Sequence, residues 1–143
     1  MACPSESRGL YDGRLEHKVV AAIIRNSLGY VLCEMGGTFI APQGHVLTGE
    51  SNVQALDRIV SSQTTLYLRR IHSLEAGNRY SLSDCSADRH SWTVYVCLVG
   101  GEPNNELGWR VVQRKDLPAL AMSPELRYWI NRDADSRRLK RVS

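Results

Sequence analysis

A loop with two glycines and the helix expected after it hold the residues best suited to chemistry. The loop is residues 42–51, PQGHVLTGES, with Glu50 near its end, and Arg58 follows eight positions later. A carboxylate and a guanidinium can form a charge-assisted, bidentate pair that ties a loop to a helix. The same two residues can also be an ordinary exposed pair, which contributes only about 0–1 kcal/mol. The local sequence alone leaves both interpretations open.

This segment resembles the Nudix box, G-x5-E-x7-R-E-U-x-E-E-x-G-U, where U is a bulky aliphatic residue. Gly44, Glu50 and Arg58 fall at the required intervals, and Val60 and Leu66 fill the first and last aliphatic positions. The resemblance covers roughly residues 18–131. It implies a Nudix-like domain there, in which Gly44, Glu50 and Arg58 form the structural part of the box and the glutamate pairs with the arginine.

Four positions depart from the box, and three of them are the ones that carry its metal chemistry. The glutamates of R-E-U-x-E-E are replaced by Ile59, Ser62 and Gln63, and the last glycine is Thr65. In a helix the three positions share one face. The resemblance implies that this face holds Mg²⁺, a hard cation that favours anionic carboxylates beside substrate phosphates and activates water there. Ile59 offers no ligand atom, so we expect a degenerate box without a metal site. We therefore expect no cofactor. Mg²⁺ is implied only if the chain is a hydrolase.

The four histidines do not predict a metal centre, because they are scattered along the chain. Cys85 and His90 do not match a zinc spacing, and no C-x-x-C pair is present. His45 lies in the box loop and is a candidate ligand contact, but a surface side chain is the interpretation we favour. The segment 84–90 is expected to be a solvated polar turn. The remaining histidines are His17 and His72.

Several other residues are candidates for a site in the expected cleft. Catalytic residues stay unknown, with Glu50 and Glu106 as the nominees. The candidate ligand-binding residues are His45, Phe39, Gln43, Glu34, Arg79 and Trp92. Aromatic residues can stack on a planar ligand, although in strands they are more often part of the core. Arginines near strand ends, Arg25 and Arg79, can meet a phosphate, but solvated charge is the interpretation we favour. Carboxylates outside the box that could replace its metal ligands are Glu34, Glu75, Glu102 and Glu106.

Hydrophobic periodicity predicts the elements that must position these residues. We expect strands at 18–25, 30–34, 38–41, 66–75, 79–82, 92–99 and 108–113. Helices are expected at 51–63, with Ser51 near its N-terminus, and at 124–131, with Ser123 as its cap. Residues 1–13 are expected to be irregular and 42–49 a loop. This order predicts an α+β domain, a Nudix-like α/β/α sandwich with a mixed sheet between helices.

Length and composition agree with one globular domain. The chain has 143 residues, of which 43% are hydrophobic and 23% charged. We divide it into a leader (1–17), a Nudix-like domain (18–131) and a basic tail (132–143). The tail carries five basic and two acidic side chains, so the rest of the chain is neutral overall. This balance argues against nucleic-acid binding as the main function, and we expect the tail to be a frayed, solvated end.

Other features bear on compartment and partners. The longest apolar run, 19–24, is far too short to span a membrane, and the N-terminus lacks an apolar signal core. The four irregularly spaced cysteines fit a reduced, cytoplasmic protein. A homodimer is compatible with the sequence, but nothing in it requires one.

Three functions follow from the departures in the box. The first is a Nudix-fold protein that binds a nucleotide-like or other small ligand without the usual Mg²⁺-dependent diphosphate hydrolysis, a pseudoenzyme repurposed for a specialised pathway. The second is a hydrolase of a nucleoside diphosphate-linked substrate with metal ligands outside the box. The third is an RNA-binding module assisted by the basic tail. The altered box favours the first.

Overall fold

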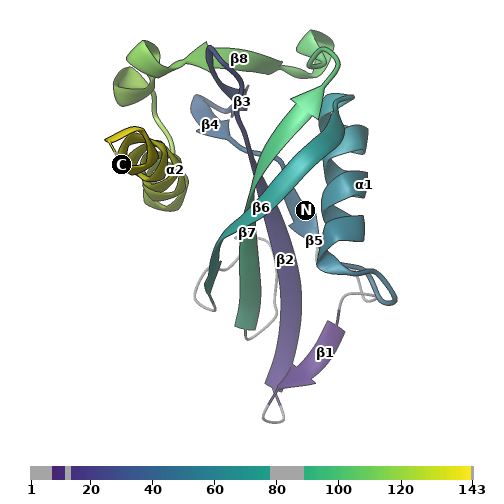
Figure 1. Cartoon of the computed structure of the whole chain (residues 1–143). Helices are drawn as coiled ribbons and strands as arrows, with labels where there is room; N and C mark the ends of the chain where they lie inside the picture. Colours follow the sequence, from purple (N-terminus) through teal and green to yellow (C-terminus); the bar gives the residue numbers. More distant parts are fainter. Residues whose placement is uncertain (1–7, 12–13, 78–88, 143) are drawn as a thin grey trace.

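A computed structural model describes residues 8–11, 14–77 and 89–142 of the chain (Figure 1). The described residues form eight strands: β1 (Arg8–Tyr11), β2 (Arg14–Ile24), β3 (Gly29–Met35), β4 (Thr38–Ile40), β5 (Gln43–His45), β6 (Tyr67–Gly77), β7 (Arg89–Gly100) and β8 (Trp109–Gln113). The α-helices are α1 (Asn52–Thr64) and α2 (Pro124–Val142). Two short 3-10 helices, Asn105–Leu107 and Arg114–Ala119, complete the described elements.

The strands form two sheets. In the five-stranded sheet the order is β1-β2-β7-β6, and β5 pairs with β2 beside β1. Strands β2 and β7 run parallel, whereas the other pairs are antiparallel, so this sheet is mixed as predicted. Strands β4, β3 and β8 form a separate three-stranded antiparallel sheet. The sequence predicted one sheet, and the second is a feature that only the structure reveals.

Residues 19–24 of the central strand β2 are buried on both faces of the sheet, which explains their continuous apolar run. Val19, Ala21 and Ile23 belong to the core cluster that includes residues of α2. Val20, Ala22 and Ile24 belong to the other cluster, which includes the buried side of α1. Alternate side chains of a strand point to opposite faces, so α1 and α2 cover opposite sides of the sheet (Figure 1). The predicted α/β/α sandwich is confirmed.

Helix α1 begins where its capping residues predict. The Ser51 hydroxyl accepts a hydrogen bond from the Gln54 backbone N–H at 3.1 Å, and the Gln54 side chain accepts one from the Ser51 N–H at 2.8 Å. This is a capping box, which satisfies two amide groups at the helix start. The helix ends at Thr65, whose φ of 64° is left-handed. The glycine that the Nudix box has there would adopt this conformation without strain.

The structure has strands at three places where the sequence predicted irregular structure. Residues 8–11 and 14–17, expected in an irregular leader, form β1 and the start of β2, which pair with each other. Residues 43–45, expected in a loop, form β5. The two short strands were missed because each depends on pairing with β2, a long-range contact that local periodicity does not report. The expected strand at 79–82 lies outside the described residues.

The prediction of a frayed basic tail is also wrong. Helix α2 continues from Pro124 to Val142, well past the predicted end at residue 131. Asp133, inside the expected tail, is buried and accepts a hydrogen bond from the Tyr30 hydroxyl at 2.6 Å. Arg25, expected to be solvated, lies 3.5 Å from the same carboxylate and is only 17% exposed. A buried carboxylate with these partners fixes this part of the helix to the sheet.

None of the helices in the described part of the chain combines the length and apolar character needed to cross a membrane.

Candidate functional site

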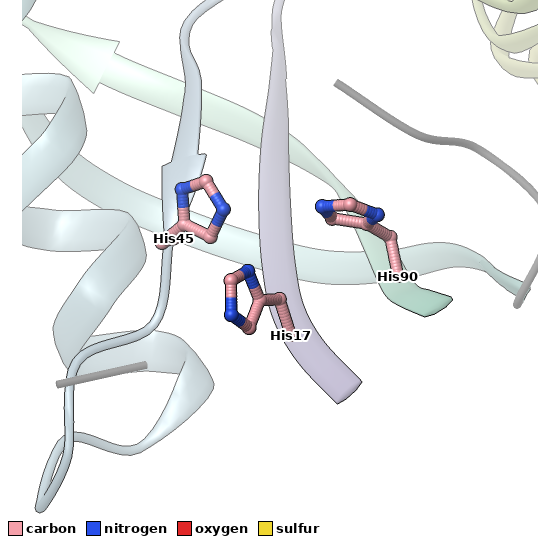
Figure 2. A group of neighbouring side chains, drawn as sticks. All are labelled: His17, His45 and His90. Carbon is pink, nitrogen blue, oxygen red and sulfur yellow. The ribbon is translucent and has the colours of Figure 1, made fainter. Parts of the chain in front are cut away.

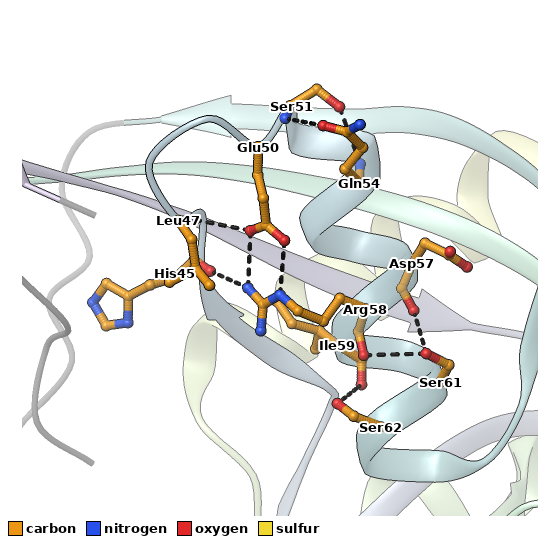
Figure 3. A network of polar contacts seen from close by, with 10 residues as sticks. All are labelled: His45, Leu47, Glu50, Ser51, Gln54, Asp57, Arg58, Ile59, Ser61 and Ser62. Atoms are coloured by element: carbon orange, nitrogen blue, oxygen red, sulfur yellow. Dashed lines mark hydrogen bonds and ion pairs between the residues drawn. The ribbon is translucent and has the colours of Figure 1, made fainter. Parts of the chain in front are cut away.

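The box loop and α1 are held together by Glu50 and Arg58 (Figure 3). Arg58 Nε donates to Glu50 Oε2 at 2.8 Å, and Arg58 Nη2 donates to Glu50 Oε1 at 3.0 Å. Arg58 Nη2 also donates to the backbone carbonyl of His45 at 2.8 Å, and the Leu47 N–H donates to Glu50 Oε1 at 2.9 Å. One side-chain pair therefore joins the helix, the loop and the end of β5. The structure has the bidentate geometry that the sequence allowed.

The charges of this pair stabilise each other. The hydrogen bond from Arg58 lowers the pKa of Glu50, with further help from the Leu47 N–H, although partial burial opposes the shift. The same bond raises the pKa of Arg58. Both groups are thus charged near neutral pH, and Glu50 uses both carboxylate oxygens within the loop. This arrangement suits a structural role that ties the loop to the helix.

Gly44 lies where β5 passes beneath α1. A Cβ atom at this position would lie 2.9 Å from Ile59 Cδ1 and 3.2 Å from Ile59 Cγ1. Ile59 itself is buried in the core between α1 and the sheet. This close approach explains why position 44 is a glycine, although its backbone is not left-handed. It also shows that Ile59, which replaces a glutamate of the box, lies in the core.

The other two altered positions of the box are less buried. Ser62 is exposed, and its hydroxyl donates to the Ile59 carbonyl of its own helix at 3.4 Å. The side-chain amide of Gln63 donates to the Gln43 carbonyl at 3.1 Å, which links α1 to β5. These side chains stabilise the helix and its junction with the strand. Neither is a carboxylate, so this face fits a Mg²⁺ ligand set poorly.

The acidic residues considered as replacements lie on separate elements. Glu34, at the exposed end of β3, lies 3.7 Å from Arg110, and Glu75 on β6 lies 3.7 Å from Arg132. Glu102 and Glu106 are exposed in and beside the 3-10 helix Asn105–Leu107. No group of three acidic residues converges on one point within the described ranges, 8–11, 14–77 and 89–142.

An open depression of about 350 Å³ lies on the three-stranded sheet. It is lined by Glu34, Asn105, Gly108, Trp109 and Arg110. Glu34 is one of the predicted ligand-binding residues, and the cationic Arg110 side chain is 57% exposed. Phe39, another predicted ligand-binding residue, is buried with the Arg110 guanidinium 5.2 Å from its ring centre. Phe39 thus supports the wall of the depression from below.

The remaining predicted ligand-binding residues lie elsewhere. Gln43 and His45 are in β5, and Trp92 is in β7, where it packs against Trp129 of α2 with ring centres 5.9 Å apart. The structure therefore separates these three from Glu34 and Phe39, which face each other across β3 and β4. Arg79 lies outside the described residues.

His45 is not the surface side chain that we favoured. It is 3% exposed, and His17 and His90 lie beside it, equally buried. Burial, together with smaller contributions from the charges of His17 and His90, lowers the pKa of His45 to about 4. Burial also lowers the pKa of His90, which belongs to β7 and not to a solvated turn. Both shifts favour the neutral form of the His45 and His90 rings.

Sequence reasoning missed this cluster because its members are 28 and 45 residues apart along the chain. A signal was available for two of them: His17 and His90 each lie within two residues of an expected apolar strand, where burial is expected. The pairing of β2 with both β5 and β7 was needed to bring them together.

Comparisons with known proteins agree with this architecture. No protein-family model matches the sequence, and no curated protein matches it either. Among solved structures, the E. coli ORF135 protein is similar with a TM-score of 0.71 and 16% identity, over 90% of this chain and 96% of that one. A NUDIX hydrolase from Nitrosomonas europaea has a TM-score of 0.69 and 16% identity, covering 85% and 90%. A MutT protein from Bacillus halodurans has a TM-score of 0.68 and 14% identity, covering 80% of each chain. This protein has the Nudix fold.

Proposed function

We propose that this Nudix-fold protein binds a nucleotide-like or other small anionic ligand and does not carry out Mg²⁺-dependent diphosphate hydrolysis at its box. The observation that carries the proposal is the placement of the three side chains that replace the glutamates of the box. Ile59 is in the core, and Ser62 and Gln63 hydrogen-bond to backbone carbonyls. Mg²⁺ needs oxygen ligands in near-octahedral array and is usually held by carboxylates together with substrate phosphates.

The depression beside Glu34 and Arg110 supports the binding part of the proposal. A guanidinium presents several donors in a fixed plane and recognises phosphate oxygens through paired hydrogen bonds. The Glu34 carboxylate can accept from the hydroxyl or amino groups of a sugar or a base. The 3.7 Å separation of the two side chains is longer than a hydrogen bond, so a ligand can engage both.

Hydrolysis with ligands from outside the box is the second candidate function. The similar structures favour it, because two of them are named as a hydrolase and a MutT protein. The retained Glu50–Arg58 pair is compatible with either function, since its role is structural in both. Against hydrolysis stands the placement of Glu34, Glu75 and Glu106 on elements that do not bring their carboxylates together.

The cytoplasm is the compartment we propose. Cys33 and Cys97 are free and buried in the core, and burial raises the pKa of the Cys97 thiol to about 12. Such thiols act as small apolar side chains in a reducing environment.

An assay of phosphate release distinguishes ligand binding without hydrolysis from hydrolysis. The protein is incubated with nucleoside diphosphate sugars, dinucleotides and nucleoside triphosphates, with Mg²⁺ or Mn²⁺ present. We expect no release above the rate without protein. Robust turnover that disappears on addition of chelator would contradict the proposal and establish hydrolysis.

Ligand binding is measured by calorimetry with the same compounds. We expect Arg110→Gln to weaken binding at least about tenfold, a loss of about 1.4 kcal/mol. Arg114→Gln is the matched control, because Arg114 is equally exposed and does not line the depression. If both variants bind as the wild type does, the depression is not the binding site.

A further inference from the structure

Three histidines from three neighbouring strands meet on one face of the five-stranded sheet (Figure 2). His17 of β2 is directly opposite His90 of β7 in the parallel register. His45 of β5 is opposite Val19, two residues after His17 on the same strand. Residues paired across strands, and residues two apart within a strand, point to the same face. The register alone therefore places the three side chains together.

This face of the sheet is the one opposite α1. Val19 belongs to the core cluster on the α2 side, whereas Gly44, next to His45, faces Ile59 of α1. The histidine cluster is therefore distinct from the box positions 59, 62 and 63. One link between the two regions is the His45 backbone, whose carbonyl accepts a hydrogen bond from Arg58.

The ring geometry brings ligand atoms together. One nitrogen of each ring can be chosen so that all three lie within 4.8 Å of one another. The ring centres are 5.3 to 6.0 Å apart, and the rings meet edge to face, so none stacks flat on another. This is the only such convergence of His, Cys, Asp or Glu side chains in the portion of the chain that the structure describes.

The polar atoms of His45 point to a missing ligand. Its side chain is buried, yet neither Nδ1 nor Nε2 has a hydrogen-bond partner among the described residues. Leaving a buried polar group without a partner is unfavourable. Packing of the three rings against one another does not remove this cost, whereas a bond from a ring nitrogen to a cation does.

We propose that His17, His45 and His90 bind one divalent transition-metal ion of the zinc class through three imidazole nitrogens. A fourth position is left for water or a small anion, since three-histidine sites commonly keep one open. Zinc–nitrogen bonds of about 2.0–2.1 Å place the nitrogens about 3.3 Å apart in a tetrahedron, so the rings rotate inward on binding. Imidazole nitrogen suits Zn²⁺, Co²⁺, Ni²⁺ and Cu²⁺, whereas Mg²⁺ requires oxygen ligands.

Metal titration of the full-length, untagged protein tests this site. The protein is treated with chelator, exchanged into metal-free buffer near pH 7.5, and titrated with Zn²⁺ against a competing chromophoric chelator. We expect one equivalent to bind with micromolar or tighter affinity and Mg²⁺ not to compete. Less than one equivalent at this affinity overturns the proposal, whatever the variants do.

Single substitutions assign the ligands. We expect His17→Gln, His45→Gln and His90→Gln each to weaken Zn²⁺ binding at least about 100-fold, because even loss of a group supporting a ligand costs about 10–100-fold. His72→Gln is the matched control, since His72 is the fourth histidine of the chain and is exposed on β6. Unchanged binding in any of the three cluster variants, or a comparable loss in the control, contradicts the assignment.

A second measurement avoids dependence on variants that do not fold. Long-range ¹H–¹⁵N spectra of the wild-type protein record the imidazole nitrogens before and after one equivalent of Zn²⁺. We expect three rings to shift and one, His72, to remain unchanged. A shift of His72, or of no ring, overturns the proposal. The readout is metal binding alone, so it can succeed or fail independently of the phosphate-release assay that tests the proposed function.

Discussion

The carboxylate of Glu50 and the guanidinium of Arg58 meet in a two-bond pair, with nitrogen–oxygen distances of 2.8 and 3.0 Å. The two residues are separated by the start of α1, and the pair joins the loop before the helix to the helix itself (Figure 3). Because Arg58 also holds the His45 carbonyl, the pair fixes the end of β5. Its geometry gives the first two predictions.

Glu50→Gln is expected to lower stability more than it lowers ligand binding. The amide keeps one acceptor but loses the charge that Arg58 and the Leu47 N–H recognise. Arg58 is 41% exposed, so solvent screens the pair, and we expect a loss of about 1 kcal/mol. Urea unfolding measures it, with Asp57→Asn, an exposed carboxylate of the same helix, as control. A normally stable Glu50→Gln that has lost ligand binding or turnover would show that Glu50 has a chemical role.

The stabilisation from Glu50 should disappear in acid. Its pKa is lower in the folded protein than the usual 4.5, so the unfolded chain binds the proton more readily. The contribution is complete above the unfolded pKa and is lost as the pH falls through the lowered folded pKa. Unfolding free energies of wild type and Glu50→Gln, measured from about pH 6 to about pH 3, should therefore converge at the acidic end. If the difference in unfolding free energy between the two proteins stays constant across this pH range, the charge of Glu50 is not the source of that difference.

Gly44→Ala is expected to destabilise the protein by about 1–3 kcal/mol through overpacking. The new methyl group would lie 2.9 Å from Ile59 Cδ1, an atom that valine lacks. Ile59→Val alone should cost about 0.5–1.5 kcal/mol. In the double variant the clash is relieved, so we expect the cost to be lower than the sum by at least about 0.5 kcal/mol. If the costs of the two single substitutions add strictly in the double variant, measured by chemical denaturation, Ile59 does not limit the size of the side chain at position 44.

Asp133→Ala is expected to destabilise the protein by about 3 kcal/mol or more. The change removes the acceptor of the Tyr30 hydroxyl and the carboxylate beside the largely buried Arg25, and loss of one partner leaves a poorly solvated charge. Asp133→Asn should cost less, because the amide oxygen can still accept from Tyr30. Thermal unfolding compares both with Asp135→Ala, an exposed neighbour on α2. Equal effects at 133 and 135 would show that α2 is not anchored through Asp133.

The amino-acid sequence by itself determined the box and its helix. The capping residues and apolar stripe of α1 act within a few positions, and the spacing of Gly44, Glu50 and Arg58 sets their relation once the helix forms. The apolar run of β2 was evident for the same reason, since a strand buried on both faces needs no partner to be recognised. These local patterns, together with the resemblance to the Nudix box, predicted the α/β/α class of the fold but not its second sheet.

Only the tertiary structure decided which of the remaining residues share a site. Strand β5 exists because it pairs with β2, and the parallel register of β2 and β7 places His17 beside His90. The basic end of the chain is helical, and Asp133 within it contacts Tyr30, 103 residues earlier in the chain. Contacts across such separations depend on strand order, register and helix docking. Those are properties of the whole packed chain, and a local window of sequence does not contain them.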